Sequence, residues 1–293
     1  MSILYMKKIF FLLLILSSLN AFAGASKRWY ADNYAENALL QQSWATKFFF
    51  QDYIFQGDES ILDIGSGIGN ITAMMANYVP HGYVIGIDSD EAVVNIAKQD
   101  YKYIKNLSFL NKFAGDANFY ILHKEKFDII TSFSVLHWIS NNDKVLKGMF
   151  TALKPNGICY LRLASKGGDP VQDIADRLVK SAKWKAYFTN FKSHMKRFTV
   201  GEYAALLEKN NFQIVSIGNV EDKNFLNNTA QLKMQIKSWL PYYHHLKSIN
   251  SLEADKFVNE IVDVYISKFP VNQNGSVILY DHNLEIVATK PAA

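Results

Sequence analysis

The chain has 293 residues, of which 49% are hydrophobic and 20% are charged. This composition is typical of a globular domain and excludes a disordered or fibrous chain. The net charge of +4 gives no argument for a nucleic-acid surface. The single cysteine, Cys159, excludes an intramolecular disulfide and a zinc cluster of several cysteines. Its apolar context, "GICYLRL", predicts a small core residue within a strand.

The first residues have the three-part pattern of a secretory signal peptide. Two lysines precede the apolar run 9–16, and an A-x-A pattern ends at Ala23. We therefore expect residues 1–23 to be removed and the mature chain to be exported, to the periplasm or outside the cell. An uncleaved signal that anchors the protein in the membrane is the alternative, and Met6 is an alternative initiator. Without residues 1–23 the chain has 29 basic and 27 acidic side chains, a net charge of +2.

The next predicted element is an amphipathic helix over 34–55, where apolar side chains recur three and four residues apart. Beyond it, apolar strands alternate with helices, which is typical of a doubly wound, mostly parallel sheet with helices on both faces. The predicted fold is therefore Rossmann-like α/β. The predicted strands are 60–65, 82–88, 107–111, 127–133 and 158–164; the helices are 70–79, 90–104 and 142–154, with a loop over 112–126.

The alternation stops after the fifth strand. Further helical patterns follow, and Thr199 with Glu202 forms a capping box for a helix that precedes another strand. Two β-rich runs around a polar turn predict a C-terminal antiparallel hairpin over 275–290. We predict that residues 24–293 form a single domain, with helical cap segments over about 168–196 and 227–269.

A glycine-rich loop follows the first strand of the predicted sheet. In "ILDIGSGIGNIT", Asp63 stands two places before Gly65, and Gly67 and Gly69 follow at alternate positions. A dinucleotide fingerprint, G-x-G-x-x-G, would need a glycine where Asn70 stands. The spacing therefore argues against a nicotinamide cofactor.

Two more acids follow the next strands. Asp88 lies at the tip of the second strand, where a carboxylate can bind both ribose hydroxyls of an adenosine. Asp116, in "FAGDAN" after the third strand, can meet the adenine amino group. Any one of these acids could be a solvated carboxylate or a helix cap. Together with Asp63 they fall on the edge where open α/β sheets bind ligands, and so predict an adenosine site.

From about Trp29 to Lys290 the chain resembles class I S-adenosylmethionine-dependent methyltransferases, and is most similar to the trans-aconitate and juvenile hormone acid methyltransferase group. The motifs are "ILDIGSGIGNIT", "GIDSD", "AGDAN" and "FDIITSFSVLHWI". The resemblance implies S-adenosylmethionine as cofactor. The residues it assigns to cofactor binding are Asp63, Gly65, Ser66 and Gly67 near the methionine part, Asp88 and Ser89 at the ribose and adenine, Asp116 and Ala117 at the adenine edge, and Ser132 facing the methionine part.

The same resemblance places His137 and Trp138 beside the methyl acceptor and Gln41 over the pocket. The chain lacks a Pro-Cys loop, an Asn/Asp-Pro-Pro-aromatic loop and a convincing set of metal ligands. A carboxylate acceptor needs none of these, because it is already ionised at neutral pH. We therefore predict methylation of a small organic acid to its methyl ester.

Two alternatives remain open. His137 could act as a general base for a hydroxyl or amine acceptor, or the protein could be a secreted, non-catalytic binder of the cofactor. We expect a monomer that acts on a small-molecule acceptor. We expect no nucleic acid, no metal and no stable membrane insertion once the signal has been removed.

Overall fold

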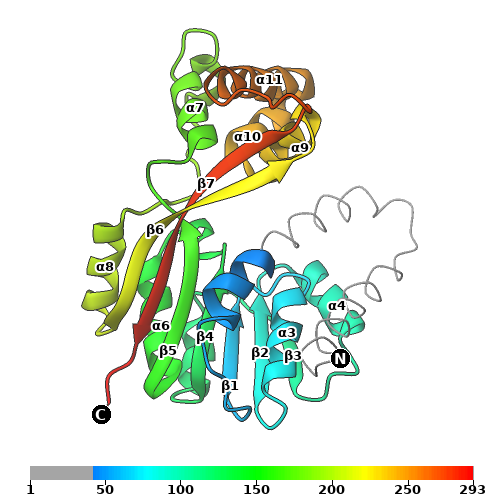
Figure 1. Cartoon of the computed structure of the whole chain (residues 1–293). Coiled ribbons are helices and arrows are strands. Elements are labelled where there is room, and N and C mark those ends of the chain that lie inside the picture. The colour runs from blue at the N-terminus through cyan, green and yellow to red at the C-terminus, as the bar shows by residue number, and fades with distance from the viewer. Residues whose placement is uncertain (1–41, 293) are drawn as a thin grey trace, which may run out of the picture. The chain divides into compact units, whose positions relative to one another are not determined.

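A seven-stranded sheet runs through the part of the chain that the computed structural model describes, residues 42–292 (Figure 1). The strand order is β3-β2-β1-β4-β5-β7-β6. The first five strands are parallel, and β7 pairs antiparallel with both β5 and β6. The strands are β1 (Ser60–Ile64), β2 (Tyr83–Asp88), β3 (Leu107–Asn111), β4 (Phe127–Phe133), β5 (Leu153–Ala164), β6 (Gln213–Leu226) and β7 (Val277–Thr289).

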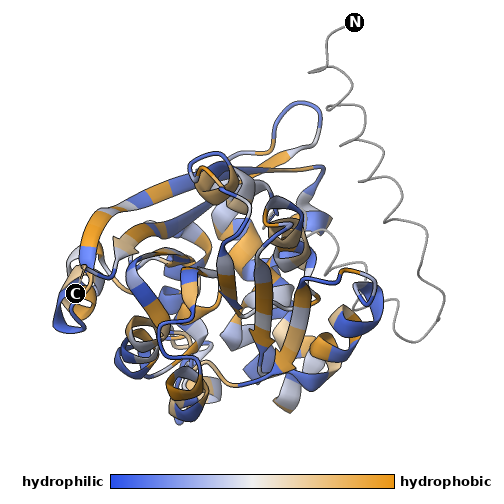
Figure 2. Cartoon of the chain, turned by 90° about the horizontal axis from the view of Figure 1, so that it is seen from below, coloured by the Kyte–Doolittle hydropathy of each residue, from blue (hydrophilic) through white to orange (hydrophobic). Residues whose placement is uncertain are grey.

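Helices cover both faces of this sheet, as the alternating pattern predicts. Helices α3 and α4 lie on one face, and α5, α6 and α8 lie on the other (Figure 1). Seen from below, the central strands are mainly hydrophobic and polar residues lie on the outer turns of the helices (Figure 2). The helices are α3 (Asn70–Tyr78), α4 (Glu91–Asp100), α5 (Ala117–Leu122), α6 (Asn142–Ala152), α7 (Pro170–Leu178), α8 (Val200–Lys209), α9 (Thr229–Trp239), α10 (Pro241–Ile249) and α11 (Ser251–Lys268), with short turns η2 (Thr46–Phe50), η3 (Leu136–Trp138) and η4 (Lys185–Phe188).

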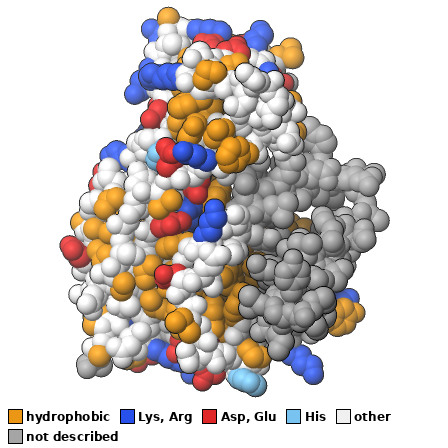
Figure 3. All heavy atoms as spheres, in the orientation of Figure 1, with side chains coloured by type: hydrophobic (Ala, Val, Ile, Leu, Met, Phe, Trp, Pro, Cys, Tyr) orange, Lys and Arg blue, Asp and Glu red, His pale blue; other side chains and the backbone are white. Residues whose placement is uncertain are grey.

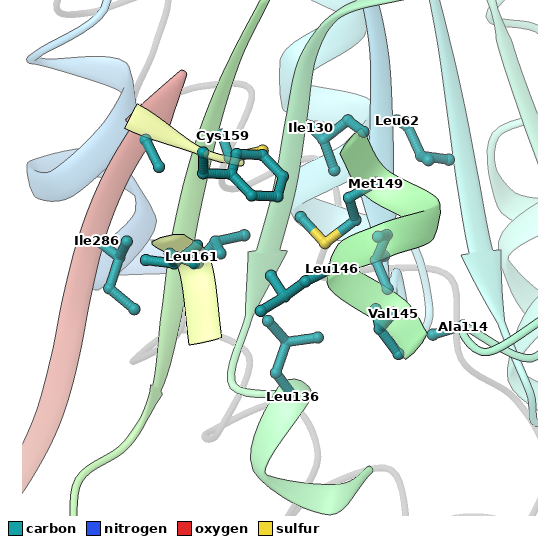
Figure 4. Packing of buried hydrophobic residues seen from close by; sticks show 14 of the residues in the cluster. Leu62, Ala114, Ile130, Leu136, Val145, Leu146, Met149, Cys159, Leu161 and Ile286 are labelled. Atoms are coloured by element: carbon teal, nitrogen blue, oxygen red, sulfur yellow. The ribbon is translucent and has the colours of Figure 1, made fainter. Parts of the chain in front are cut away.

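The main core lies between the sheet and α6. Figure 4 shows Leu146 and Met149 of α6 directed at side chains of β4 and β5. Cys159 of β5 is fully buried there, which confirms the prediction of a small core residue. Leu136 of η3 is buried in the same cluster, beside Leu146, and so fixes the turn that follows β4.

The helices α7, α9, α10 and α11 form a lobe with its own hydrophobic cluster, which we call the cap. Trp184 is fully buried at its centre, packs against Phe257 and donates a hydrogen bond from Nε1 to Glu260 at 3.0 Å. The long strands β6 and β7 continue beyond β5 as a two-stranded ribbon that reaches the cap. Pro241 begins α10, because a proline lacks the N–H that would continue α9.

Three predicted elements differ in the structure. The helix predicted over 34–55 ends at Phe50, and its part before residue 42 lies outside the described residues, as do Gln41 and the predicted signal peptide. The predicted loop 112–126 contains α5. The predicted hairpin over 275–290 is wrong: β7 is one continuous strand that pairs antiparallel with β5 and β6.

The misread turn in β7 has a physical explanation. Asp281 pairs in register with Asp222 of β6, so its backbone stays in the ladder. Asn283 donates from Nδ2 to Asp281 at 3.0 Å, which satisfies polar side chains that a turn would expose to water. Figure 3 shows acidic and basic side chains next to one another below a hydrophobic surface in the upper part of the view. The polar stretch marks the place where the ribbon leaves the sheet.

One other prediction on local structure is confirmed. Thr199 and Glu202 form the predicted capping box at the start of α8, with both reciprocal hydrogen bonds present. Within residues 42–292, no helix combines the length and the apolar character needed to span a bilayer. The same residues contain no group of three or more His, Cys, Asp or Glu side chains placed to hold a metal ion.

Candidate functional site

The glycine loop after β1 is held close to the neighbouring strand. The backbone N–H groups of Gly65 and Ser66 both donate to the Ile87 carbonyl, at 2.7 and 3.0 Å. Gly65 has a φ of +78°, and a Cβ at this position would lie 2.1 Å from the side chain of Val135. A side chain here would therefore collide with the loop after β4, so a glycine is needed.

Asp63 is buried beneath this loop, with 3% of its surface exposed. Its two carboxylate oxygens accept hydrogen bonds from the hydroxyls of Thr72, at 2.6 Å, and Thr131, at 2.9 Å. Burial raises the pKa of Asp63 to about 6, although the two hydroxyl donors act in the opposite direction. The side chain thus joins β1, α3 and β4 directly under the loop, and its predicted contact with the cofactor amino group stays a prediction.

Asp88 connects the end of β2 to the same loop. Its carboxylate accepts from the backbone N–H of Gly67 at 3.0 Å and from that of Asp90 at 2.9 Å. Each carboxylate oxygen can accept more than one hydrogen bond, so acceptor positions for ribose hydroxyls remain. Ser89, the next residue, is exposed.

Asp116 caps the helix that starts at Ala117. It accepts from the backbone N–H groups of Asn118 and Phe119, and the bond from Phe119 is the main cause of a lowered pKa for its carboxyl group. This acid therefore caps a helix, and its predicted contact with the adenine stays a prediction. The strand end still connects it to Asp88, because Lys112 donates its backbone N–H to the Asp88 carbonyl and pairs its ammonium with Asp116 at 3.5 Å.

Two serines complete this edge of the sheet. Ser132 is fully buried and donates to the Ile64 carbonyl at 3.0 Å, so it braces β4 against β1 beside the loop. The hydroxyl oxygen of Ser66 is buried and has no hydrogen-bond partner among the described residues. A buried hydroxyl without a partner is unfavourable unless a ligand satisfies it. The loop thus fits a polar ligand such as the methionine part of S-adenosylmethionine.

The Leu136-His137-Trp138 turn follows β4 and is held from both sides. Nδ1 of His137 accepts the backbone N–H of Ala164 at 3.1 Å, and its carbonyl accepts the backbone N–H of Lys196 at 2.7 Å. Since Nδ1 is an acceptor, the neutral ring carries its proton on Nε2. Burial, with 6% of the residue exposed, lowers the pKa of His137 to about 3.

Trp138 has a different environment. It is 40% exposed, and its ring centre lies 5.0 Å from that of His137. Two residues were assigned to the acceptor pocket. Trp138 is therefore the one whose exposed surface a ligand could contact. His137 lies behind it as a neutral hydrogen-bonded support.

Sequence reasoning missed a buried arginine near this site. Arg162 of β5 is 1% exposed and forms ion pairs with Asp222 of β6 and Glu285 of β7. The ring of Trp44 lies 4.6 Å from its guanidinium carbon. The only signal in the sequence was a charged residue inside the apolar strand "CYLRLA", and its partners are 60 and 123 residues away.

The comparisons with known proteins agree with this geometry. Residues 56–244 match the family described as methyltransferase domain, and the chain belongs to that family. It is therefore an S-adenosylmethionine-dependent methyltransferase of the Rossmann-like class, as the resemblance implied. S-adenosylmethionine is its cofactor, and the residues of the glycine loop together with Asp88 would hold it.

Three similar proteins illustrate the match. Juvenile hormone acid O-methyltransferase of Drosophila melanogaster is 28% identical over 221 residues, which is 72% of each chain. A protein of Invertebrate iridescent virus 6 named as a methyltransferase is 28% identical over 165 residues, 56% of this chain and 59% of the viral protein. The crystal structure of YcgJ from Bacillus subtilis covers 86% of this chain and all of its own, with a TM-score of 0.59 at 20% identity, which shows the shared fold.

Proposed function

We propose that the enzyme methylates the carboxylate of a small, partly apolar organic acid and releases a methyl ester. The observation that carries the proposal is the state of His137. Its Nδ1 is occupied by the Ala164 N–H, and burial keeps its pKa at about 3. A general base works best when its pKa lies near the operating pH, so the turn after β4 holds a poor base.

A carboxylate acceptor is compatible with such a site. When bound, S-adenosylmethionine supplies an electrophilic methyl group on a sulfonium ion. A carboxylate oxygen needs no deprotonation at neutral pH to accept it, so the protein has to align the acceptor and exclude water. The half-exposed ring of Trp138 offers an apolar surface for that purpose. The similarity to a juvenile hormone acid O-methyltransferase also supports an acid as the acceptor.

Many aromatic residues of the cap lie in or against its own hydrophobic cluster. Trp184 and Phe257 pack against each other inside the cap rather than facing outward. Both side chains therefore belong to the hydrophobic core of the cap.

A matched acceptor panel tests the proposal. The full chain would be incubated with S-adenosylmethionine carrying a labelled methyl group and with octanoic acid, 1-octanol or octylamine, three compounds of one chain length. We expect transfer to octanoic acid at a rate clearly above that to the other two. Transfer to the alcohol or the amine instead would contradict the proposal and restore an acceptor that needs a base.

A further inference from the structure

An acid acceptor raises the question of which cation faces its carboxylate. His137 is neutral and cannot do so. Arg162 of β5 is a buried cation, but Asp222 and Glu285 already neutralise its charge. His137 of η3 and Arg162 of β5 are therefore poor candidates, and a cation can come instead from a segment that joins the site from elsewhere in the fold.

The segment that leaves the cap after η4 reaches the acceptor turn directly. The backbone N–H of Lys196 donates to the carbonyl of His137 at 2.7 Å. Two residues later, Phe198 forms a short parallel bridge with Ser165, immediately after β5. These contacts hold the backbone of Lys196 at the carboxyl end of the sheet, next to the residue that precedes Trp138.

The side chain of Lys196 is exposed and its ammonium lies 5.0 Å from the centre of the Phe198 ring. Over residues 42–292, no carboxylate lies within ion-pair distance of it. Its neighbours differ, because Arg197 pairs with Asp176 at 2.8 Å and Lys166 pairs with Glu202 at 2.9 Å. Lys196 thus carries a positive charge that the described part of the protein does not neutralise.

The charge of the surrounding segment has the same sign. Residues 177–197 include seven lysines and arginines and no aspartate or glutamate. Two of these cations, Lys183 and Arg197, pair with acids elsewhere in the fold. The remaining positive side chains attract anions over a distance of about 10 Å at ordinary salt. They would therefore guide an organic acid toward the turn that carries Trp138 and disfavour an amine.

We propose that Lys196 is a specificity-determining residue whose ammonium pairs with the carboxylate of the acceptor. This inference rests on the proposed function and adds the group that selects an acid. The long, flexible stem of a lysine allows the ammonium to follow the acceptor, while the hydrogen bond to His137 fixes the base of the stem. Lys196 takes no part in bond making, so its removal should affect binding far more than turnover.

The test compares Lys196→Met with Lys196→Arg and with Lys166→Met as a matched control at the same end of β5. Binding of octanoate, 1-octanol and octylamine to each full-length variant would be measured by calorimetry in the presence of S-adenosylhomocysteine. We expect the wild type to prefer octanoate over 1-octanol, Lys196→Met to lose about tenfold in octanoate affinity alone, and Lys196→Arg to keep most of it. In turnover, KM for octanoate should rise by a similar factor, with kcat within about twofold.

The opposing results are distinct. Equal affinity of the wild type for octanoate and 1-octanol, or an unchanged preference in Lys196→Met, would overturn the role of Lys196. So would an equal loss in Lys166→Met, since that would indicate a general surface-charge effect. If the wild type forms methyl octanoate while Lys196→Met behaves like wild type, only this inference fails. If octylamine or 1-octanol is the compound that is methylated, the proposed function fails with it.

Discussion

At the residue scale, burial shifts the pKa of two titratable side chains and so affects their protonation state. Asp63 and His137 are both titratable groups at the carboxyl edge of the sheet, and burial disfavours the charged form of each. Two hydroxyl donors still support the Asp63 carboxylate, whereas His137 receives a backbone N–H that fixes a neutral ring. Asp63 thus holds the cofactor loop in place through its hydrogen bonds. The neutral ring of His137 packs beside Trp138.

Replacement of Asp88 tests the cofactor site. Asp88→Ala removes the acceptor of the Gly67 N–H and the predicted acceptor for ribose hydroxyls, so we expect binding of S-adenosylhomocysteine to weaken by about 1–3 kcal/mol. Calorimetric titration measures this change. Asp90→Ala is the control: Asp90 caps α4 through the Ala92 N–H, so its loss should lower stability and leave the affinity unchanged. Equal losses in both variants would contradict the assignment of Asp88.

The neutral state of His137 makes a second prediction. His137→Asn keeps an oxygen that can accept the Ala164 N–H, whereas His137→Leu leaves that buried group without a partner. We expect the free energy of unfolding to fall by about 1–3 kcal/mol more in the leucine variant. Denaturant unfolding gives these values.

The kcat of the His137→Asn variant gives a further prediction. The asparagine variant should keep kcat within about tenfold of wild type, since the loss of a general base commonly costs about 10²–10⁴-fold. The dependence of kcat on pH should show no limb near the ordinary pKa of histidine, because that of His137 is about 3. A collapse of activity in His137→Asn would assign the base role to this residue.

At the element scale, the loop after β1 depends on its close contact with the loop after β4. A Cβ at Gly65 would meet Val135, so Gly65→Ala should displace the glycine loop and abolish cofactor binding. Gly201→Ala is the matched control, because nothing lies within 4 Å of a Cβ there and alanine favours α8. We expect this control to bind cofactor normally. Calorimetric titration of both variants would check the pair, and normal binding by Gly65→Ala would contradict the geometry of the loop.

The junction between β5 and α7 predicts a dependence of stability on pH. Asp169 is 5% exposed and accepts the backbone N–H of Gln172 as the cap of α7. Burial first, and then the charge of Asp281, raises its pKa to about 7, while Arg197 lowers it. A carboxyl group with a raised pKa in the fold stabilises the protein fully below its unfolded pKa, near 4, and loses that contribution as the pH rises through about 7.

Asp169→Asn keeps the cap and removes the charge. Relative to wild type, its free energy of unfolding should therefore increase by about 1–3 kcal/mol between pH 5 and pH 8. Urea unfolding at the two pH values measures the change, with Asp173→Asn, a half-buried acid of the same helix, as control. A difference that is the same at both pH values would show that Asp169 is ionised throughout this range.

At the scale of the whole molecule, the sequence predicted the parallel sheet well because most of its strands, such as β1 and β4, are buried apolar runs. Strand β4 has the predicted bounds, 127–133. Prediction failed where tertiary contacts override local pattern. The polar residues 281–283 look like a turn, but pairing with β6 keeps them in a strand. The short helix α5 is set by the Asp116 cap within a stretch that had been predicted as a loop.

The same distinction between local pattern and tertiary contacts applies to the residues of the candidate site. The glycine loop and Asp88 were recognisable because their spacing along the chain is local, and the structure brings them together at 3.0 Å. Arg162 and Lys196 were not recognisable, because their significance comes from partners that only the fold brings near. Gln41 lies outside the described residues, so its place over the acceptor pocket stays a prediction.

The central claim is that the product is a methyl ester, and its chemical lability tests this most directly. The full-length enzyme would transfer a labelled methyl group to octanoic acid, and the isolated product would then be treated with mild alkali. An ester is hydrolysed under these conditions and releases its label as methanol, whereas a methyl ether or a methylamine is stable. We predict near-complete release of labelled methanol. A product that keeps its label in alkali would contradict the account.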